Sequence, residues 1–121
     1  MTRYSTVVGA KDAISSLIDV AGDQLPIAVL EYLDQVKFTA TSEDGLYFPC
    51  PFKESEASGA LKAVEASVLA AIADLRYGKQ ERRIEVNMER TAAFLFSTYI
   101  ATIGGLGKQD PDVKAKLKSD G

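Results

Sequence analysis

Four basic side chains surround Gly78 in this sequence: Arg76, Lys79, Arg82 and Arg83. Guanidinium and ammonium groups bind phosphate through charge-assisted hydrogen bonds, so this cluster could hold the phosphates of a nucleotide. Cations at the end of a helix are also expected without any ligand, because they interact favourably with the negative end of the helix dipole. The spacing alone leaves both interpretations open.

Glu54 and Glu56 form a second group of residues that could do chemistry. A carboxylate becomes reactive when a cleft removes it from water and a hydrogen-bond donor holds it in place. Acidic residues in the first turn of a helix are equally common without such a role, because they stabilise the positive end of the helix dipole.

The composition excludes several kinds of site. The chain has no histidine, which rules out Ser-His and Cys-His nucleophile pairs and histidine metal sites within it. Its single cysteine, Cys50, lies between two prolines and has no second cysteine for a disulfide, a zinc site or a redox motif. We therefore expect no metal and a reducing, cytoplasmic setting. The net charge of −3 predicts no nucleic-acid partner.

The elements that must position these residues are mostly helical. Apolar residues at helical spacing predict a hairpin of two helices over 14–21 and 26–36, with Gly22 ending the first in the left-handed conformation. The alanine-rich segment 54–77 predicts a long helix that Gly78 ends, and its broad apolar surface indicates burial on more than one side.

Two further segments favour short strands. Ile84, Val86 and Met88 alternate with polar residues, which predicts a strand with one covered face. A lone strand cannot satisfy its backbone groups, so we expect a neighbour, supplied either by a hairpin over 36–48 or by another chain or missing segment. Asn87 is expected to cap a final helix that reaches Ile103 and stops at glycines 104 and 105.

The length of 121 residues allows one domain. We expect a single partial domain over 1–107 and a charged, flexible tail over 108–121. Residues 1–10 contain no apolar signal-peptide core, and the longest uncharged stretch, 91–107, is shorter than the about 20 residues needed to cross a bilayer. These features predict a protein without a membrane segment.

The order of three sequence motifs resembles a known family. Leu25-Pro26 and the segment 36–39 (Val-Lys-Phe-Thr) precede a proline-rich turn at 46–52 (Leu-Tyr-Phe-Pro-Cys-Pro-Phe). The long helix then runs into 75–80 (Leu-Arg-Tyr-Gly-Lys-Gln), and 84–88 (Ile-Glu-Val-Asn-Met) follows. Together these segments resemble the N-terminal portion of the class III CoA-transferases and alpha-methylacyl-CoA racemases, over residues 25–105.

The resemblance implies a fold, a substrate and a mechanism. The fold would be part of a Rossmann-like α/β unit, in a homodimer or paired with a longer chain. The substrate would be coenzyme A or acyl-CoA, with the basic cluster on its phosphates. The family's catalytic Asp aligns with Glu56, or with Glu54 if the loop 78–83 carries a gap, and would take up the acyl group as a mixed anhydride. The racemases pair this acid with a histidine, and this chain has none, so CoA transfer is favoured over racemisation.

Other functions remain open at this level. The family's opening strand and glycine loop are absent from this sequence, so it corresponds to a truncated or inactive form as readily as to a working transferase. One alternative is a non-catalytic helical module whose apolar faces pair with a second copy or a longer chain. Another is a small isomerase or cyclase with a carboxylate in an apolar pocket.

Overall fold

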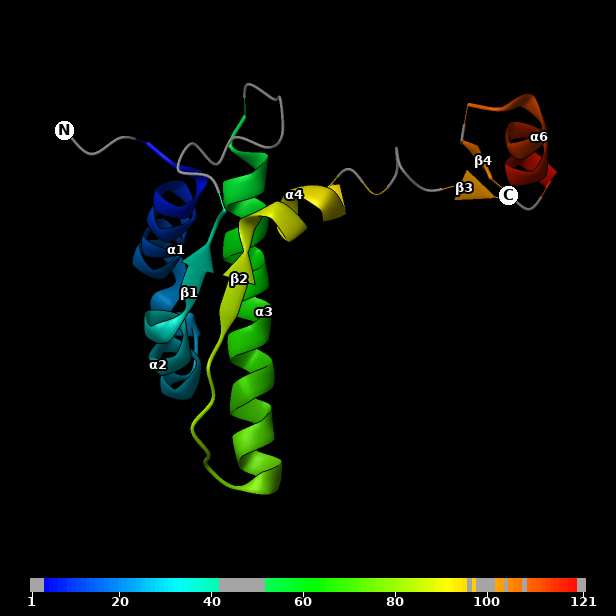
Figure 1. Ribbon diagram of the computed structural model, residues 1–121. Coiled ribbons are helices and arrows are strands. Elements are labelled where there is room, and N and C mark those ends of the chain that lie inside the picture. The colour runs from blue at the N-terminus through cyan, green and yellow to red at the C-terminus, as the bar shows by residue number, and fades with distance from the viewer. Residues whose placement is uncertain are drawn as a thin grey trace.

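The computed structural model describes residues 4–41, 52–95, 97, 102–103, 105–107 and 109–119. In these residues the chain is mostly helical, with a two-stranded parallel sheet and a two-stranded antiparallel sheet (Figure 1). The prediction of a mostly helical α/β chain is confirmed at this coarse level. None of the described helices is long and apolar enough to span a bilayer.

The first two helices form the predicted hairpin. Helix α1 (Thr6–Ala21) begins after Ser5, whose Oγ accepts a hydrogen bond from the Val8 amide at 3.2 Å. A 3-10 turn, η1 (Gly22–Gln24), connects it to α2 (Ile27–Gln35). The left-handed cap predicted at Gly22 is wrong, since its φ is −62° and the chain continues directly into the turn. A Cβ at Gly22 would lie 3.1 Å from Ile18 Cγ2, so close packing accounts for the glycine.

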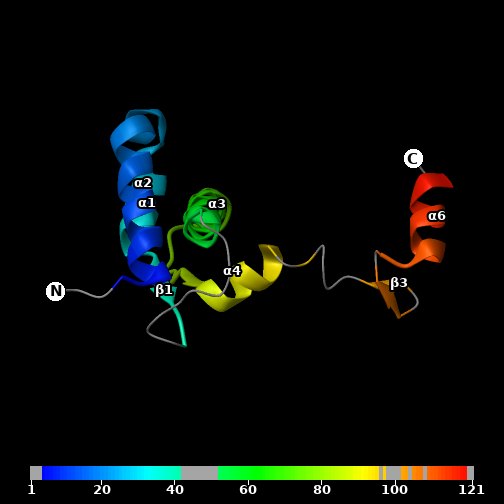
Figure 2. The ribbon, with the colours of Figure 1, turned by 90° about the horizontal axis from the view of Figure 1, so that it is seen from above.

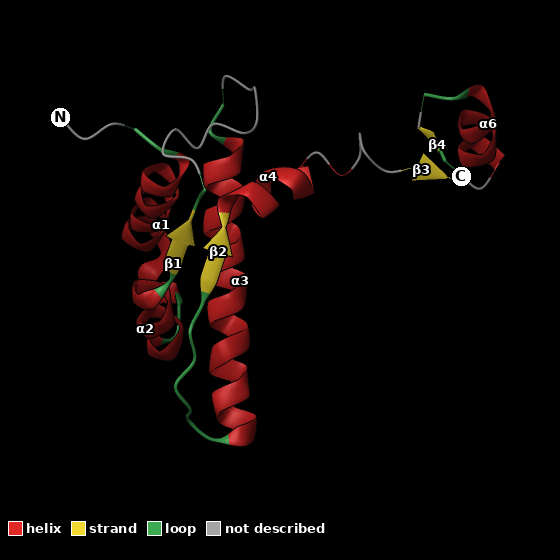
Figure 3. Cartoon of the chain, in the orientation of Figure 1, coloured by secondary structure: helices red, strands yellow, loops and turns green. Residues whose placement is uncertain are grey.

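The parallel sheet joins segments that are far apart in the sequence. Strand β1 (Lys37–Thr39) pairs with β2 (Glu85–Asn87), with Phe38 opposite Val86 (Figure 3). The strand predicted over 84–88 is confirmed for Glu85–Asn87, while Met88 belongs to the next helix. Its neighbour β1 comes from the first half of the segment predicted as a hairpin over 36–48, and the two strands are parallel. A parallel pair requires a crossover connection, and the long helix α3 (Glu54–Tyr77) provides it. The second half of the predicted hairpin lies outside the described residues.

Small residues allow α3 to approach the helical hairpin closely. A Cβ at Gly59 would lie 2.9 Å from Met88 Sδ and 3.7 Å from Ala10 Cβ, so the glycine leaves room for the buried methionine. Seen from above, α3 lies beside α1 and α2 (Figure 2). The core between these elements consists of Ala10, Ile14, Val29, Leu33, Phe38, Ala60, Ala63, Val86 and Met88.

The region after β2 differs from the predicted single helix. Helix α4 (Met88–Leu95) begins as expected at Asn87, whose Oδ1 accepts a hydrogen bond from the Arg90 amide at 2.9 Å. Ile103, however, belongs to β3 (Thr102–Ile103), which pairs with β4 (Leu106–Gly107). β-branched residues favour strands, and Gly105, with φ of 83°, makes the turn between the two.

The charged segment 108–121, for which the sequence predicts a flexible tail, contains helix α6 (Pro111–Ser119). In both views β3, β4 and α6 lie apart from the helices and the sheet of residues 4–95 (Figures 1 and 2). The site residues predicted from the sequence all lie within residues 4–95.

Candidate functional site

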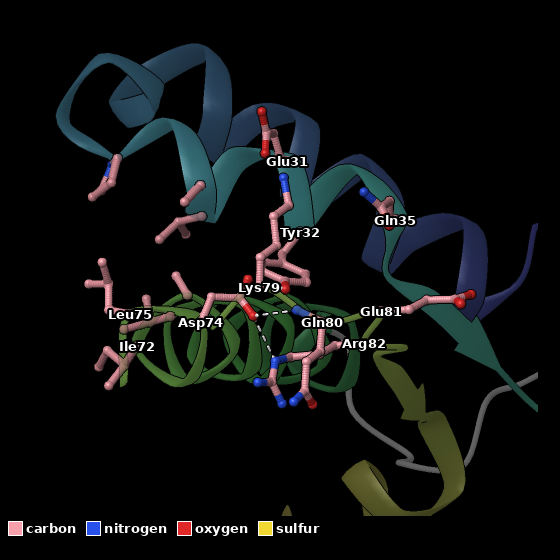
Figure 4. Close-up of a pocket in the computed structure, with 15 residues that line it drawn as sticks. Glu31, Tyr32, Gln35, Ile72, Asp74, Leu75, Lys79, Gln80, Glu81 and Arg82 are labelled. Carbon is pink, nitrogen blue, oxygen red and sulfur yellow. Dashed lines mark hydrogen bonds and ion pairs between the residues drawn. The ribbon is translucent and has the colours of Figure 1, made fainter. Parts of the chain in front are cut away.

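A groove of about 810 Å³ lies between α2 and the C-terminal half of α3 (Figure 4). Most of its wall is apolar, and its polar side chains come from α2, from the end of α3 and from the segment after α3. Such a combination is typical of small-molecule sites. The α2/α3 groove is lined by Pro26, Ala28, Val29, Glu31, Tyr32, Gln35, Val68, Ala71, Ile72, Asp74, Leu75, Lys79, Gln80, Glu81 and Arg82.

Asp74 is the centre of the polar part of the groove. Its Oδ1 accepts hydrogen bonds from Arg82 Nε at 2.9 Å and from the Gln80 amide at 3.4 Å, both drawn as dashed lines in Figure 4. Its Oδ2 accepts a hydrogen bond from the Tyr32 hydroxyl. These bonds connect α2, the end of α3 and the following segment, so the carboxylate fixes the shape of the groove.

The same contacts set the charge of the cluster. The hydrogen bond from Tyr32, followed by that from Arg82, lowers the pKa of Asp74. The hydrogen bond to Asp74 raises the pKa of Tyr32, and the carboxylate also raises the pKa of Arg82. Asp74 is therefore an ionised acceptor with neighbours on both oxygens, which suits a structural role better than a reactive one.

Sequence reasoning missed Asp74 and Tyr32. Tyr32 lies in α2 and Asp74 in α3, 42 positions apart, and no local spacing links them. The one local signal for this cluster was the position of Asp74, an acidic residue eight positions before the basic Arg82 and separated from it by Gly78. Gly78 has φ of 86° and its amide donates to the Asp74 carbonyl at 3.0 Å, which ends α3 and turns the chain back towards the carboxylate.

The structure divides the predicted basic cluster. Lys79 and Arg82 line the α2/α3 groove, whereas Arg76 and Arg83 do not. Arg76 is exposed in the last turn of α3, and Arg83 Nη2 lies 3.8 Å from the exposed Glu81 Oε1. Of the four predicted phosphate-binding cations, two therefore remain at the groove.

Glu54 and Glu56 differ in their surroundings. Glu54 is exposed, while Glu56 is only 5% exposed and lies against α1. The Tyr4 hydroxyl donates a hydrogen bond to Glu56 Oε1 at 2.7 Å. A Cβ at Gly9 would lie 2.6 Å from Glu56 Cγ, so the glycine in α1 makes room for this carboxylate.

Tyr4 is the donor that accompanies the buried acid. Partial burial, followed by the hydrogen bond to Glu56, raises the pKa of Tyr4 to about 12. Lys53 Nζ lies 4.9 Å from the centre of its ring, a cation-π contact. The hydroxyls of Thr6 and Ser55, in the first turns of α1 and α3, are buried and lack a partner among the described residues.

Glu56 lies outside the α2/α3 groove. The axial distance from Glu56 to Ile72 is about 24 Å at about 1.5 Å per residue. A single ligand would have to extend along α3 to contact both. The predicted carboxylate thus lies in the first turn of α3, whereas Lys79 and Arg82 lie in the segment that follows the other end of this helix.

A second, smaller hollow of about 450 Å³ lies between α3, β2 and α4. Leu69, Val86 and Phe94 supply its apolar surface, and Lys62 Nζ lies 4.3 Å from the centre of the Phe94 ring. None of the predicted site residues lines it. In the described ranges, no group of three or more Cys, Asp or Glu side chains is placed to hold a metal ion.

Comparison of the chain with known protein families, with curated proteins and with solved structures finds no match.

Replacing Asp74 by Asn should reduce the dependence of stability on acid pH. Because the pKa of Asp74 is lowered below its ordinary value of 3.8, its ionised form contributes stability that is fully present above that value and is lost as the pH falls through the lowered pKa. Urea unfolding between about pH 6 and pH 2 should show a shallower loss of the free energy of unfolding in Asp74→Asn than in the wild type. Asp19→Asn, at an exposed position of α1, is the control, and equal profiles for wild type and Asp74→Asn would contradict the role of the cluster.

Proposed function

We propose that this chain is a CoA-transferase-like protein that binds acyl-CoA in the α2/α3 groove. The observation that carries the proposal is the combination of an apolar wall with the cations Lys79 and Arg82 among the residues that line the groove. Acyl-CoA has the same division, with apolar and phosphorylated parts. The resemblance of the sequence to the class III CoA-transferases suggests the same ligand.

The two cations would contribute differently to binding. The Arg82 bond to Asp74 uses Nε, so the two terminal nitrogens of its guanidinium are not part of that bond and can donate to a phosphate. Lys79 offers a flexible ammonium. Glu31 and Glu81 also line the groove and oppose a highly charged anion, so binding should be moderate and sensitive to salt.

Lys79→Ala should weaken the binding of CoA and acyl-CoA. We expect an increase in Kd of about 3- to 10-fold, because a charge-assisted bond at a solvent-exposed rim is worth about 1 kcal/mol. Isothermal titration calorimetry at low salt measures the change. Arg76→Ala removes the same charge outside the groove and should change Kd by less than about 2-fold. Equal losses in the two variants, or no heat with the wild type, would argue against binding in the groove.

Glu56 is the proposed acyl acceptor. Its carboxylate oxygen would attack the thioester carbonyl carbon; a C–O bond forms, the C–S bond breaks, and CoA leaves as the thiolate, giving a mixed anhydride. Three features support this role: the first-turn position in α3, where the helix dipole favours a negative charge, the burial of the side chain, and the hydrogen bond from Tyr4. Glu54 lies in the same first turn of α3 but is exposed, which supports Glu56 over Glu54 as the acyl acceptor.

Glu56→Gln should abolish CoA transfer and leave CoA binding unchanged. The amide oxygen can still accept the Tyr4 hydrogen bond, so we expect a folded protein without the nucleophile. The assay follows formation of the CoA thioester of a second carboxylic acid from an acyl-CoA, because transfer passes CoA to the acceptor and leaves no net free thiol. Glu54→Gln is the matched control and should retain the wild-type rate. If Glu56→Gln transfers as fast as the wild type, Glu56 is not the acceptor.

A second candidate function is a non-catalytic pairing module. Leu61 and Leu75 of α3 are 65% and 88% exposed, and they lie two heptads apart on one side of the helix. Strands β1 and β2 have no third partner in the part of the chain that the structure describes. An apolar helix face and open sheet edges favour association with a second copy or a longer chain.

If pairing uses α3, charged substitutions on this face should dissociate it. Size-exclusion chromatography with light scattering should give a dimer mass for the wild type and a monomer mass for Leu61→Asp and Leu75→Asp. Val20→Asp places the same charge on α1, at a position that is 82% exposed, and should leave the dimer intact. A wild type that is monomeric at every concentration tested would rule out the self-pairing module.

A further inference from the structure

We propose that Tyr4 is the positioning residue for Glu56: its hydroxyl binds Oε1 and leaves Oε2 as the oxygen that reacts. This inference rests on the proposed function and assigns a role to a residue outside the family resemblance. Tyr4 precedes α1 and Glu56 lies in the first turn of the crossover helix, so the pair joins two segments 52 positions apart.

The fold makes room for this pair at one point. If Gly9 had a Cβ, the atom would lie 2.5 Å from the Tyr4 hydroxyl oxygen and 2.6 Å from Glu56 Cγ. Both distances are too short for unbonded atoms, so any larger residue at position 9 would displace the tyrosine, the glutamate or both. The contact therefore depends on the absence of a side chain in α1, and the two groups are held in one arrangement.

The two oxygens of Glu56 are in different states. Oε1 accepts the Tyr4 hydrogen bond, whereas Oε2 has no donor among the described residues and is not one of the buried, unpartnered atoms. Oε2 is therefore accessible to solvent, although Glu56 as a whole is only 5% exposed. Fixing one oxygen restricts rotation of the carboxylate and presents the other in a defined direction, which is what a nucleophile in an acyl transfer needs.

Tyr4 is suited to this task at physiological pH. Its pKa is raised to about 12, so the hydroxyl stays protonated and donates throughout the neutral range. Lys53, the residue before α3, places its ammonium over the Tyr4 ring, and this contact restrains the aromatic side chain. The residue is 39% exposed while its hydroxyl reaches a buried acid, so the ring extends from the protein surface to Glu56.

The direct test is the reactivity of Glu56 in Tyr4→Phe. A water-soluble carbodiimide with an amine nucleophile labels reachable carboxyl groups, and peptide mass spectrometry gives the rate at each residue. We expect labelling of Glu56 to increase by about 2- to 10-fold, the factor that corresponds to one lost hydrogen bond. Asp74 is the internal reference, because a general loosening of the fold would speed its labelling as well. Tyr77→Phe, at an exposed tyrosine, is the matched control and should change neither rate.

A second measurement does not require Tyr4→Phe to fold. Burial and, next, the hydrogen bond to Glu56 and the charge of its carboxylate raise the pKa of Tyr4 to about 12, so in Glu56→Gln, where the charge is lost, NMR of ¹³C-labelled tyrosine should show a lower pKa for Tyr4. In the transfer assay, Tyr4→Phe should lower kcat with little change in KM, because the tyrosine orients the nucleophile and does not bind CoA. Unchanged Glu56 labelling in Tyr4→Phe, equal acceleration at Asp74, or an unaltered Tyr4 titration in Glu56→Gln would each overturn the proposal. The labelling and titration do not require turnover, so their outcome is separate from that of the transfer assay.

Discussion

The close contact between α1 and α3 is the constraint on which the rest of this structure depends. Gly9 and Gly59 lie on the facing surfaces of the two helices, where side chains would meet Glu56, Tyr4 and Met88. Their absence lets a long alanine-rich helix lie directly on the hairpin and lets Met88 become fully buried beneath it. The crossover helix, once seated, brings β2 beside β1, and the parallel sheet follows from that placement.

The length of α3 separates two chemical environments. At its first turn, a glutamate is enclosed by α1 and held by a tyrosine. At its last turn, Asp74 collects donors from α2 and from the segment after Gly78, and the apolar surface between the helices stays open as a groove. In each case a carboxylate has a hydroxyl donor, but only at Asp74 does a cation complete the set. The complete set of partners suits Asp74 to a structural role, whereas a reactive role for Glu56 is a proposal.

Much of the apolar surface of α3 is left exposed by the part of the chain that the structure describes. The core uses mainly the small residues on one side of this helix, and several of its larger residues, including Leu61 and Leu75, are mostly exposed. A helix with small residues inside and leucines outside does not follow the usual order of burial. This arrangement favours both an apolar ligand in the groove and a partner on the outer face, and the two occupants would compete near Leu75, which belongs to both surfaces.

The sequence alone determined the helical hairpin, the long helix 54–77, the strand around Val86 and the cap at Asn87, because these depend on periodicity and on local hydrogen bonds. It did not determine the strand pair β3–β4 or helix α6. It also singled out Glu56, Lys79 and Arg82. Charge suggested that the two cations bind phosphate, and the resemblance to a family suggested that Glu56 accepts the acyl group; both roles are still proposals. Tertiary structure alone decided that β1 pairs with β2 in parallel, that Glu56 meets Tyr4, and that Asp74 joins Tyr32 to Arg82. Each of these contacts joins segments that are remote in sequence or depends on how closely two backbones pack. A local pattern of residue types does not specify which remote segment will pack against it.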